Sequence, residues 1–218
     1  MTKLPTETGA FDLVCTPDWL YYRVQMTRLR HVPYAYFKAD QVQNVAVSED
    51  EFNQVKYRGP SAPAEVGEEV VYLPTGNTLR CFYQESVIRE FTPTGDLVRA
   101  MPSTEAMTSI YSIAVDRDGH LWTAEPSFHR VAQYHATTGQ RLFALGGDWD
   151  PGEFNHPEDV TIYGEHAFIS DMGNQRVVRL NTRTHQFGTY RLFEQRVWQY
   201  RRFQQRELVR LDNGIYLL

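Results

Sequence analysis

The chain repeats one order of short strands and tight turns, and this repetition limits its fold more than any other feature. Residues 112–140 and 159–186 both open with an apolar strand, followed by a turn at Asp118-Gly119 or Gly164-Glu165. A second strand then ends in a carboxylate, and an Arg-Val pair comes five residues beyond that carboxylate. Such self-similarity is typical of an architecture built from copies of one unit.

The same frame extends outward from these two copies. Residues 70–91 and 207–218 carry the pattern again, so that turn positions lie 43, 46 and 49 residues apart, at Gly76, Gly119, Glu165 and Gly214. A fainter fifth copy covers residues 32–47, with residues 21–29 as its opening strand. The repeat therefore accounts for most of the chain.

Local chemistry favours strands throughout. Short runs rich in Val, Ile, Tyr, Phe and Trp alternate with clusters of Gly, Pro, Asp and Asn, and no long window keeps a helical period. Residues 194–208 are compatible with either a helix or a bent strand. A period of about 40–50 residues with about four strands per unit indicates an all-β fold, a small β-propeller of about five blades.

The predicted single domain, 1–218, divides into approximate blades 20–58, 66–103, 109–150, 157–193 and 197–218. The last blade lacks outer strands, and we expect the N-terminal strand 10–19 to complete it and close the ring. Closure matters because an open ring would expose strand edges to other chains.

Residues 146–160 (GGDWDPGEFNHPEDV) are predicted to connect two blades, since the stretch is polar and rich in turn residues. Together with the strands that follow, it resembles an NHL repeat, on the residues Phe154, Asn155, Pro157, Asp171, Asn174, Arg176 and Val177. The resemblance is good over 109–193, moderate over 70–103, partial over 207–218 and weak before residue 66. It implies a β-propeller of NHL type.

A carboxylate and an arginine five residues apart recur in two copies, as Glu125–Arg130 and Asp171–Arg176. At the end of one strand and the start of the next, these groups can pair across a hairpin loop. We interpret them as scaffold residues with no catalytic role.

Composition disfavours several classes of protein. The 218 residues carry a net charge of −5, which argues against a general polyanion binder. Cys15 and Cys81 fit neither a disulfide framework nor a zinc pattern, and no apolar run approaches the ~20 residues of a membrane span. The N-terminus lacks an apolar leader region, so we expect a cytoplasmic protein without membrane association.

Charge is nevertheless unevenly distributed. Residues 176–210 contain nine Arg and two Glu, a local charge of +7 against −12 for the rest of the chain. These arginines are either spread over a propeller surface or form a basic face for an acidic partner.

Sequence motifs predict no cofactor, no metal site and no catalytic residue. The seven His show no HxH or HExxH spacing, and GxSxG, Walker and GxGxxG motifs are absent. His156 is the strongest candidate, because the residue before a blade-opening Pro often faces an end of a propeller. Some NHL-like propellers are metal-dependent lyases with a Pro-His pair before the inner strand, and Pro157-Glu158 stands at that place here.

A metal-dependent small-molecule lyase or hydrolase therefore remains the alternative function. Calcium-dependent propeller lactonases need oxygen ligands that converge on the axis, for which Glu158, Asp159 and Asp116 are available.

A second alternative is single-stranded RNA binding through residues 176–210. Aromatic side chains stack on bases and arginines contact phosphates, and this region interleaves both kinds in Trp198, Tyr200, Arg201, Arg202 and Arg206. A blade strand with buried aromatics and arginine stems lying over them would give the same composition.

The sequence thus favours a non-catalytic module that binds a protein partner through loops on a propeller scaffold. The candidate contact residues belong to the long connection: Asp148, Trp149, Asp150, Glu153, His156 and Glu158. An inhibitor or immunity-type partner of another protein is a more specific version of this hypothesis.

Overall fold

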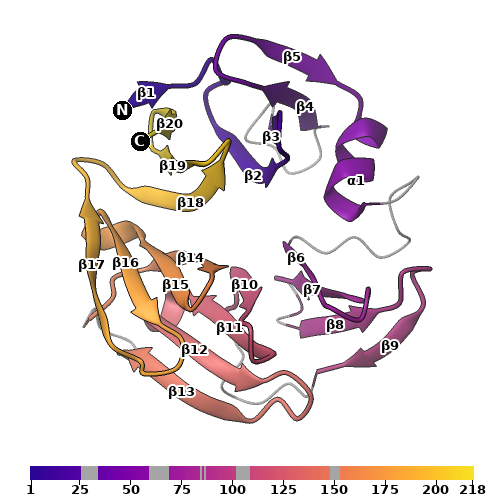
Figure 1. Cartoon of the computed structure of the whole chain (residues 1–218), viewed down its shortest axis with the longest axis vertical. Coiled ribbons are helices and arrows are strands. Elements are labelled where there is room, and N and C mark those ends of the chain that lie inside the picture. Colours follow the sequence, from indigo (N-terminus) through magenta and orange to yellow (C-terminus); the bar gives the residue numbers. More distant parts are fainter. Residues whose placement is uncertain (26–33, 59–68, 84, 86, 102–108, 148–152) are drawn as a thin grey trace. The chain divides into compact units, whose positions relative to one another are not determined.

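The computed structural model describes residues 1–25, 34–58, 69–83, 85, 87–101, 109–147 and 153–218. Their strands form five four-stranded antiparallel sheets, which confirms the predicted all-β class and a five-bladed β-propeller (Figure 1). Two compact units are distinguished along the chain: residues 1–64 with 201–218, and residues 65–200.

Three sheets use four consecutive strands of residues 65–200. The first contains β6 (Glu69–Tyr72), β7 (Thr78–Phe82), β8 (Val87–Phe91) and β9 (Leu97–Ala100). The second contains β10 (Ser112–Val115), β11 (His120–Glu125), β12 (Arg130–His135) and β13 (Arg141–Gly146). The third contains β14 (Pro157–Tyr163), β15 (His166–Asp171), β16 (Arg176–Asn181) and β17 (Phe187–Leu192).

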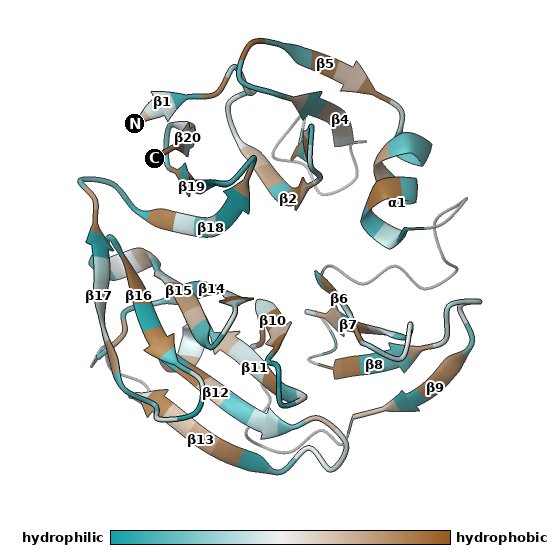
Figure 2. Cartoon of the chain, viewed as in Figure 1, coloured by the Kyte–Doolittle hydropathy of each residue, from teal (hydrophilic) through white to brown (hydrophobic). Residues whose placement is uncertain are grey.

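Apolar residues on both faces of the middle strands build the cores of these sheets, and β11, β12 and β15 are buried at nearly every position. Brown and teal segments follow one another along β12 and β16 (Figure 2). Trp122, Val131, Ile169, Val178 and Leu180 belong to one buried cluster. Because successive side chains of a strand point to opposite faces, residues two apart such as Val178 and Leu180 share one face and meet in this cluster.

The predicted hairpin turns lie where the repeat placed them in these three sheets. Gly76 lies between β6 and β7, Gly119 between β10 and β11, and Glu165 between β14 and β15. Gly76 and Gly119 have φ of 89° and 83°, values that glycine adopts without steric cost. Turn chemistry therefore fixes the first hairpin of each sheet.

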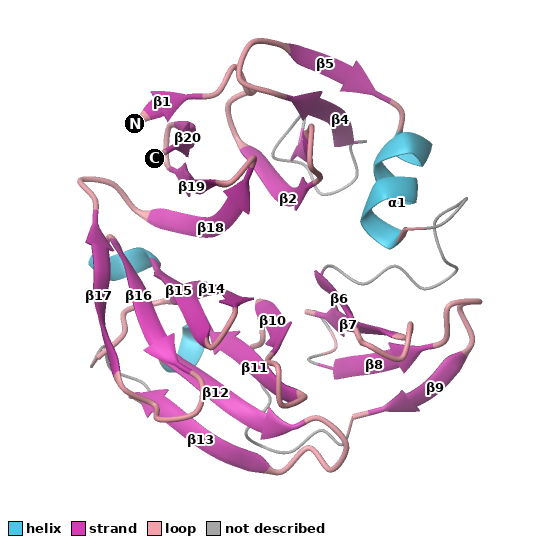
Figure 3. Ribbon diagram, in the orientation of Figure 1, coloured by secondary structure: helices cyan, strands magenta, loops and turns pink. Residues whose placement is uncertain are grey.

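The two carboxylate–arginine pairs form as predicted. Arg130 Nε donates to Glu125 Oε2 at 2.8 Å, and Arg176 Nε donates to Asp171 Oδ2 at 2.7 Å. Each pair spans a short 3-10 helix, η1 (Pro126–Phe128) or η2 (Met172–Asn174), which joins the second and third strands (Figure 3). Both carboxylates are buried, so the pairs stabilise the loops from inside.

The N-terminal sheet differs from the prediction by one strand. It contains β2 (Ala10–Cys15), β3 (Leu20–Gln25), β4 (Tyr34–Ala39) and β5 (Asn44–Val47). Residues 10–19, expected to complete the C-terminal blade, instead supply β2, which pairs with β3. The apolar run 20–25 fits a first or a second strand equally well, so the pattern left the register open.

The sheet that joins both chain ends contains β18 (Val197–Phe203), β19 (Arg206–Leu211), β20 (Gly214–Leu217) and β1 (Thr2–Lys3). Thr2 and Lys3 pair with Leu217 and Tyr216, so an N-terminal strand does complete this blade. Gly214 is the first residue of β20, so it follows the turn between the second and third strands and does not lie at the first turn as predicted. Residues 194–208 were compatible with a helix or a bent strand, and the structure has strand β18 there.

One α-helix was not predicted. Helix α1 (Glu49–Tyr57) begins at Ser48, whose side chain accepts a hydrogen bond from the backbone N–H of Glu51. Its first turn contains three acidic residues, whose negative charges interact favourably with the positive end of the helix dipole. Phe52 is buried with Tyr21 and Tyr36, which fixes the helix against β3 and β4. Within the described residues, no helix is long and apolar enough to cross a membrane.

Candidate functional site

The outer hairpin of the third of these sheets, formed by β16 (Arg176–Asn181) and β17 (Phe187–Leu192), carries a hollow. Its volume is about 550 Å³. The lining side chains come from β15, β16 and β17 and the turn before β17: His166, Arg179, Asn181, Gln186, Phe187, Gly188, Thr189 and Tyr190. We call this space the arginine hollow, because Arg179 is the one arginine among its lining residues.

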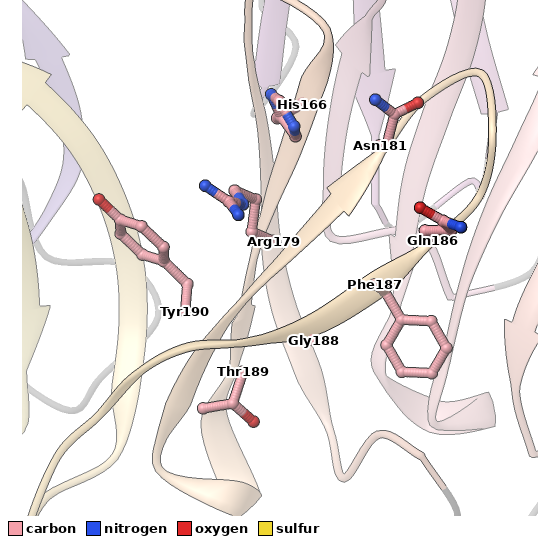
Figure 4. A pocket seen from close by; sticks show the side chains of 8 residues that line it. All are labelled: His166, Arg179, Asn181, Gln186, Phe187, Gly188, Thr189 and Tyr190. Atoms are coloured by element: carbon pink, nitrogen blue, oxygen red, sulfur yellow. The ribbon is translucent and has the colours of Figure 1, made fainter.

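Glycine at position 188 keeps the arginine hollow open. Gly188 pairs directly with Arg179 in the β16–β17 register, so no side chain stands beside the guanidinium there. A Cβ built on Gly188 would meet nothing within 4 Å. Figure 4 shows the guanidinium of Arg179 between His166 and Tyr190. Its carbon lies 5.8 Å from the centre of the Tyr190 ring, an arrangement that holds a cation over an aromatic face.

The turn between the two strands is held by its own hydrogen bonds. Asn181 Oδ1 accepts from the backbone N–H groups of Arg183 and Thr184 at 3.0 and 2.9 Å. His185 takes a left-handed conformation with φ of 58°. This local structure fixes where β17 begins and therefore where Phe187 and Gly188 lie.

A second hollow of about 470 Å³ adjoins the first. It is lined by Glu153, Asn174, Arg176, Phe187 and Leu192. Phe187 lines both hollows, and it is 44% exposed while Leu192 is 70% exposed. Phe187 and Gly188 are consecutive in β17, so the Phe187 ring points to the face opposite that of Arg179 (Figure 4), and the two hollows lie on either side of the strand. We call the two hollows, together with Phe187 and Leu192, the β17 face.

A separate cluster contains two histidines and a carboxylate. The backbone N–H of His156 donates to His129 Nδ1 at 2.9 Å, and His156 Nδ1 lies 2.8 Å from Glu158 Oε1. An ionised carboxylate only accepts, so in this contact Nδ1 of His156 is the donor to Glu158. The His156 side chain is 40% exposed and that of Glu158 is 12% exposed.

The predicted residues of the long connection fall in three places. Asp148, Trp149 and Asp150 lie outside the described residues. Glu153 is exposed at the second hollow, and its carbonyl oxygen accepts from the Arg176 guanidinium. His156 and Glu158 belong to the histidine cluster. Of the three described members of the set, Glu153 lies at the β17 face, and His156 and Glu158 do not line its hollows.

The residues considered for RNA binding are mostly engaged in packing. Tyr200 is fully buried and stacks on Phe168 at a ring distance of 5.0 Å, and Trp198 is partly buried beneath Arg196. Arg201 and Arg206 are half-buried, whereas Arg202 is exposed. A buried ring cannot stack on a base, so Tyr200 serves the core.

The candidate calcium ligands also have structural partners. Asp116 Oδ1 accepts from the backbone N–H groups of Asp118 and His120, and its Oδ2 accepts from Trp122 Nε1 at 2.9 Å. Asp159 is buried, with Ser112 Oγ at 3.2 Å from its Oδ1. In the described part of the chain, no three His, Cys, Asp or Glu residues are grouped to hold a metal ion.

Sequence reasoning missed most of the β17 face. The signal that could have found it is the segment 176–192, which has four arginines and no carboxylate. The exposure of Phe187 had no sequence signal, because an apolar residue on a strand is more often buried.

Comparison with known proteins identifies the fold. No family model matches the sequence, and no curated protein matches it. Among solved structures, a streptogramin B lyase aligns over 100% of this chain and 71% of its own, with a TM-score of 0.56 and 11% identity. The likeness is one of fold.

Two further structures support that conclusion. A catalytically inactive histidine-to-alanine variant of virginiamycin B lyase from Staphylococcus aureus, with quinupristin, aligns over 97% of this chain and 66% of its own, with a TM-score of 0.54 and 13% identity. The computationally designed protein Ika4 aligns over 69% of this chain and 88% of its own, with a TM-score of 0.51 and 10% identity. At such identities the NHL resemblance remains a resemblance, and the β-propeller fold is the shared property.

Proposed function

We propose that this chain is a protein-binding module on a β-propeller scaffold, and that the β17 face contacts the partner. The observation that carries the proposal is the joint exposure of Phe187 and Leu192 beside two hollows. Aromatic side chains and arginines are the residue types enriched at the energetic centres of protein interfaces. The face has both kinds, with space into which partner side chains fit.

The experiment compares partners captured from a lysate of the source cells by three forms of the chain. These are the wild type, a Phe187→Ser/Leu192→Ser double variant and a Leu142→Ser control. Leu142 is on the outer strand β13 of the neighbouring sheet and is 45% exposed, close to the value for Phe187. We expect one partner that the double variant loses and the control keeps, confirmed afterwards with purified components. Equal recovery by all three forms would contradict the proposal.

The histidine cluster supports a second candidate function, a proton-transfer enzyme. The carboxylate of Glu158 contacts Nδ1 of His156 and orients a ring whose side chain is 40% exposed, an arrangement suited to proton transfer. The solved structures with a similar fold include lyases, one of which is inactive after loss of a histidine. Incubation with quinupristin, followed by mass spectrometry, tests this candidate directly. Turnover that His156→Gln abolishes would favour it, and an unchanged substrate would count against streptogramin lyase activity.

A further inference from the structure

The charge of the outer hairpin indicates the chemistry of its partner. Residues 176–192 carry four arginines and no carboxylate, within a region of +7 in a chain of net charge −5. An approaching negative group is therefore attracted here and repelled by much of the remaining surface. Charge alone does not select a site, because an arginine that is already paired with a carboxylate of the chain is less available to a guest.

Two arginines of the hairpin are held by carboxylates of the chain itself. Arg176 pairs with Asp171, and Arg183 pairs with Asp118 at 2.9 Å. Arg179 is exposed, and none of the ion pairs found among the described residues includes it. Its guanidinium thus presents donors toward the arginine hollow, where no lining residue is acidic. A carboxylate accepts two parallel hydrogen bonds from this group.

The surroundings of Arg179 fit the same kind of guest. Asn181 and Gln186 add amide donors, and His166 adds a ring nitrogen. Gly188 leaves room opposite the guanidinium, and the ring of Tyr190, on the same side of β17 as Arg179, offers an apolar contact. The site is therefore suited to a carboxylate that is followed or preceded by an apolar side chain.

The backbone of β17 is poorly suited to receive a guest strand. The β16–β17 register shifts between Val177 and Val178, which marks a bulge in the outer strand. Bulges at sheet edges bend the strand and interrupt the ladder that another strand would extend. Recognition at this face must then come from side chains and not from strand addition.

We propose that the occupant of the arginine hollow of the β17 face is an acidic extended segment of a partner protein, with a carboxylate on Arg179 and a neighbouring apolar side chain on the ring of Tyr190. This inference rests on the proposed protein-binding function and adds the chemistry of the partner to it. The hydrogen bonds are charge-assisted, and the segment lies across the hairpin without joining its sheet.

The test uses two labelled synthetic peptides. One alternates Leu and Glu, and the other has Gln in place of each Glu. Fluorescence anisotropy measures their binding to the wild-type chain, to Arg179→Gln, to Gly188→Leu and to the control Arg141→Gln on β13. We expect the Glu peptide to bind about tenfold more tightly than the Gln peptide. Arg179→Gln and Gly188→Leu should remove this preference, Arg141→Gln should keep it, and salt should weaken it.

The outcomes separate this inference from the proposed function. Equal binding of both peptides, no binding of either, or a preference that survives Arg179→Gln would overturn the inference. So would an equal loss in Arg141→Gln, which would show a response to bulk charge. If the captured partner still depends on Phe187 and Leu192 in those cases, the protein-binding function stands without the acidic segment. If it does not depend on them, both proposals fail.

Discussion

The sheets β10–β13 and β14–β17 are built on one plan but expose different outer strands. Each has a first hairpin with a glycine in the left-handed region, a 3-10 turn with a carboxylate–arginine pair, and one phenylalanine on its last strand. Phe143 of β13 stacks on His185 at a ring distance of 3.8 Å and is half-buried. Phe187 of β17 is 44% exposed.

This difference shows which features the blade requires. The ion pair and the turns occur in both sheets, so they belong to the scaffold. His185, in a turn of the neighbouring sheet, covers the ring of Phe143. Phe187 has an exposed ring in the same kind of blade, so the fold does not require this cover. The exposure of Phe187 is therefore not imposed by the blade and is available for a partner.

The largest expected effect concerns the two ion pairs. Glu125→Ala should lower the free energy of unfolding by about 3–5 kcal/mol, because it leaves the buried Arg130 without its carboxylate. Asp171→Ala should cost less, about 2 kcal/mol, since the Arg176 side chain is 22% exposed and water can solvate it. Urea denaturation of both variants measures the difference. Equal losses would show that exposure of the arginine does not set the cost.

Two glycines sharpen the comparison of the outer strands. Gly146, at the end of β13, has φ of 115°, and a Cβ there would lie 2.2 Å from the carbonyl oxygen of His129. Gly146→Ala should therefore destabilise the chain by about 2–3 kcal/mol. Gly188→Ala meets open space, so its stability should stay within about 0.5 kcal/mol of the wild type. Thermal melts followed by circular dichroism suffice, and a tolerated Gly146→Ala would contradict the geometry at this bend.

The two phenylalanines should respond in opposite ways in stability and in binding. Phe143→Ala removes the stack on His185 and should cost about 1–2 kcal/mol of stability. Phe187→Ala should cost under about 0.5 kcal/mol, because the ring is 44% exposed, yet it should weaken capture of the partner. Denaturation and capture are measured on the same preparations. A stability loss at Phe187 as large as that at Phe143 would assign Phe187 to the core.

The smallest expected effect is a pH dependence of stability that arises from His185, the residue that stacks on Phe143. Burial lowers the pKa of His185 below its usual 6.5, and the nearby His120 lowers it further. Protonation of His185 therefore favours the unfolded chain, so the stability that the neutral ring contributes is present above about pH 6.5 and is lost as the pH falls below it. His185→Asn, which tolerates the left-handed backbone, should lose less stability than the wild type between about pH 7.5 and 5.5. An equal loss in both would assign the dependence to other groups.

The sequence predicted the scaffold more fully than the surface. Gly119, Glu165 and the two ion pairs are set by interactions within a few residues, and such interactions leave a local pattern. Helix α1 was missed although Ser48 and three acidic residues mark its start, because nine residues are too few for a periodic signal. The strand order at the chain ends was misassigned because β1 has only two residues.

The candidate site was predicted only at its edge. Glu153 was named and lines the second hollow, whereas Arg179, Phe187 and Gly188 were not singled out. Their role depends on which residues they pair with across β16 and β17 and on whether neighbouring segments leave them exposed to solvent. Those relations arise from tertiary packing, and they are absent from any single strand of the sequence.

The pairing of β1 with β20 has a consequence for how the chain is made. Thr2–Lys3 cannot meet Tyr216–Leu217 until residues 216 and 217 have left the ribosome, so this sheet must assemble after the residues between these two strands have been made. Residues 65–200 hold three sheets of consecutive strands and are free to fold as they emerge. A nascent molecule would then carry finished central blades for some seconds while its first residues wait for their partner.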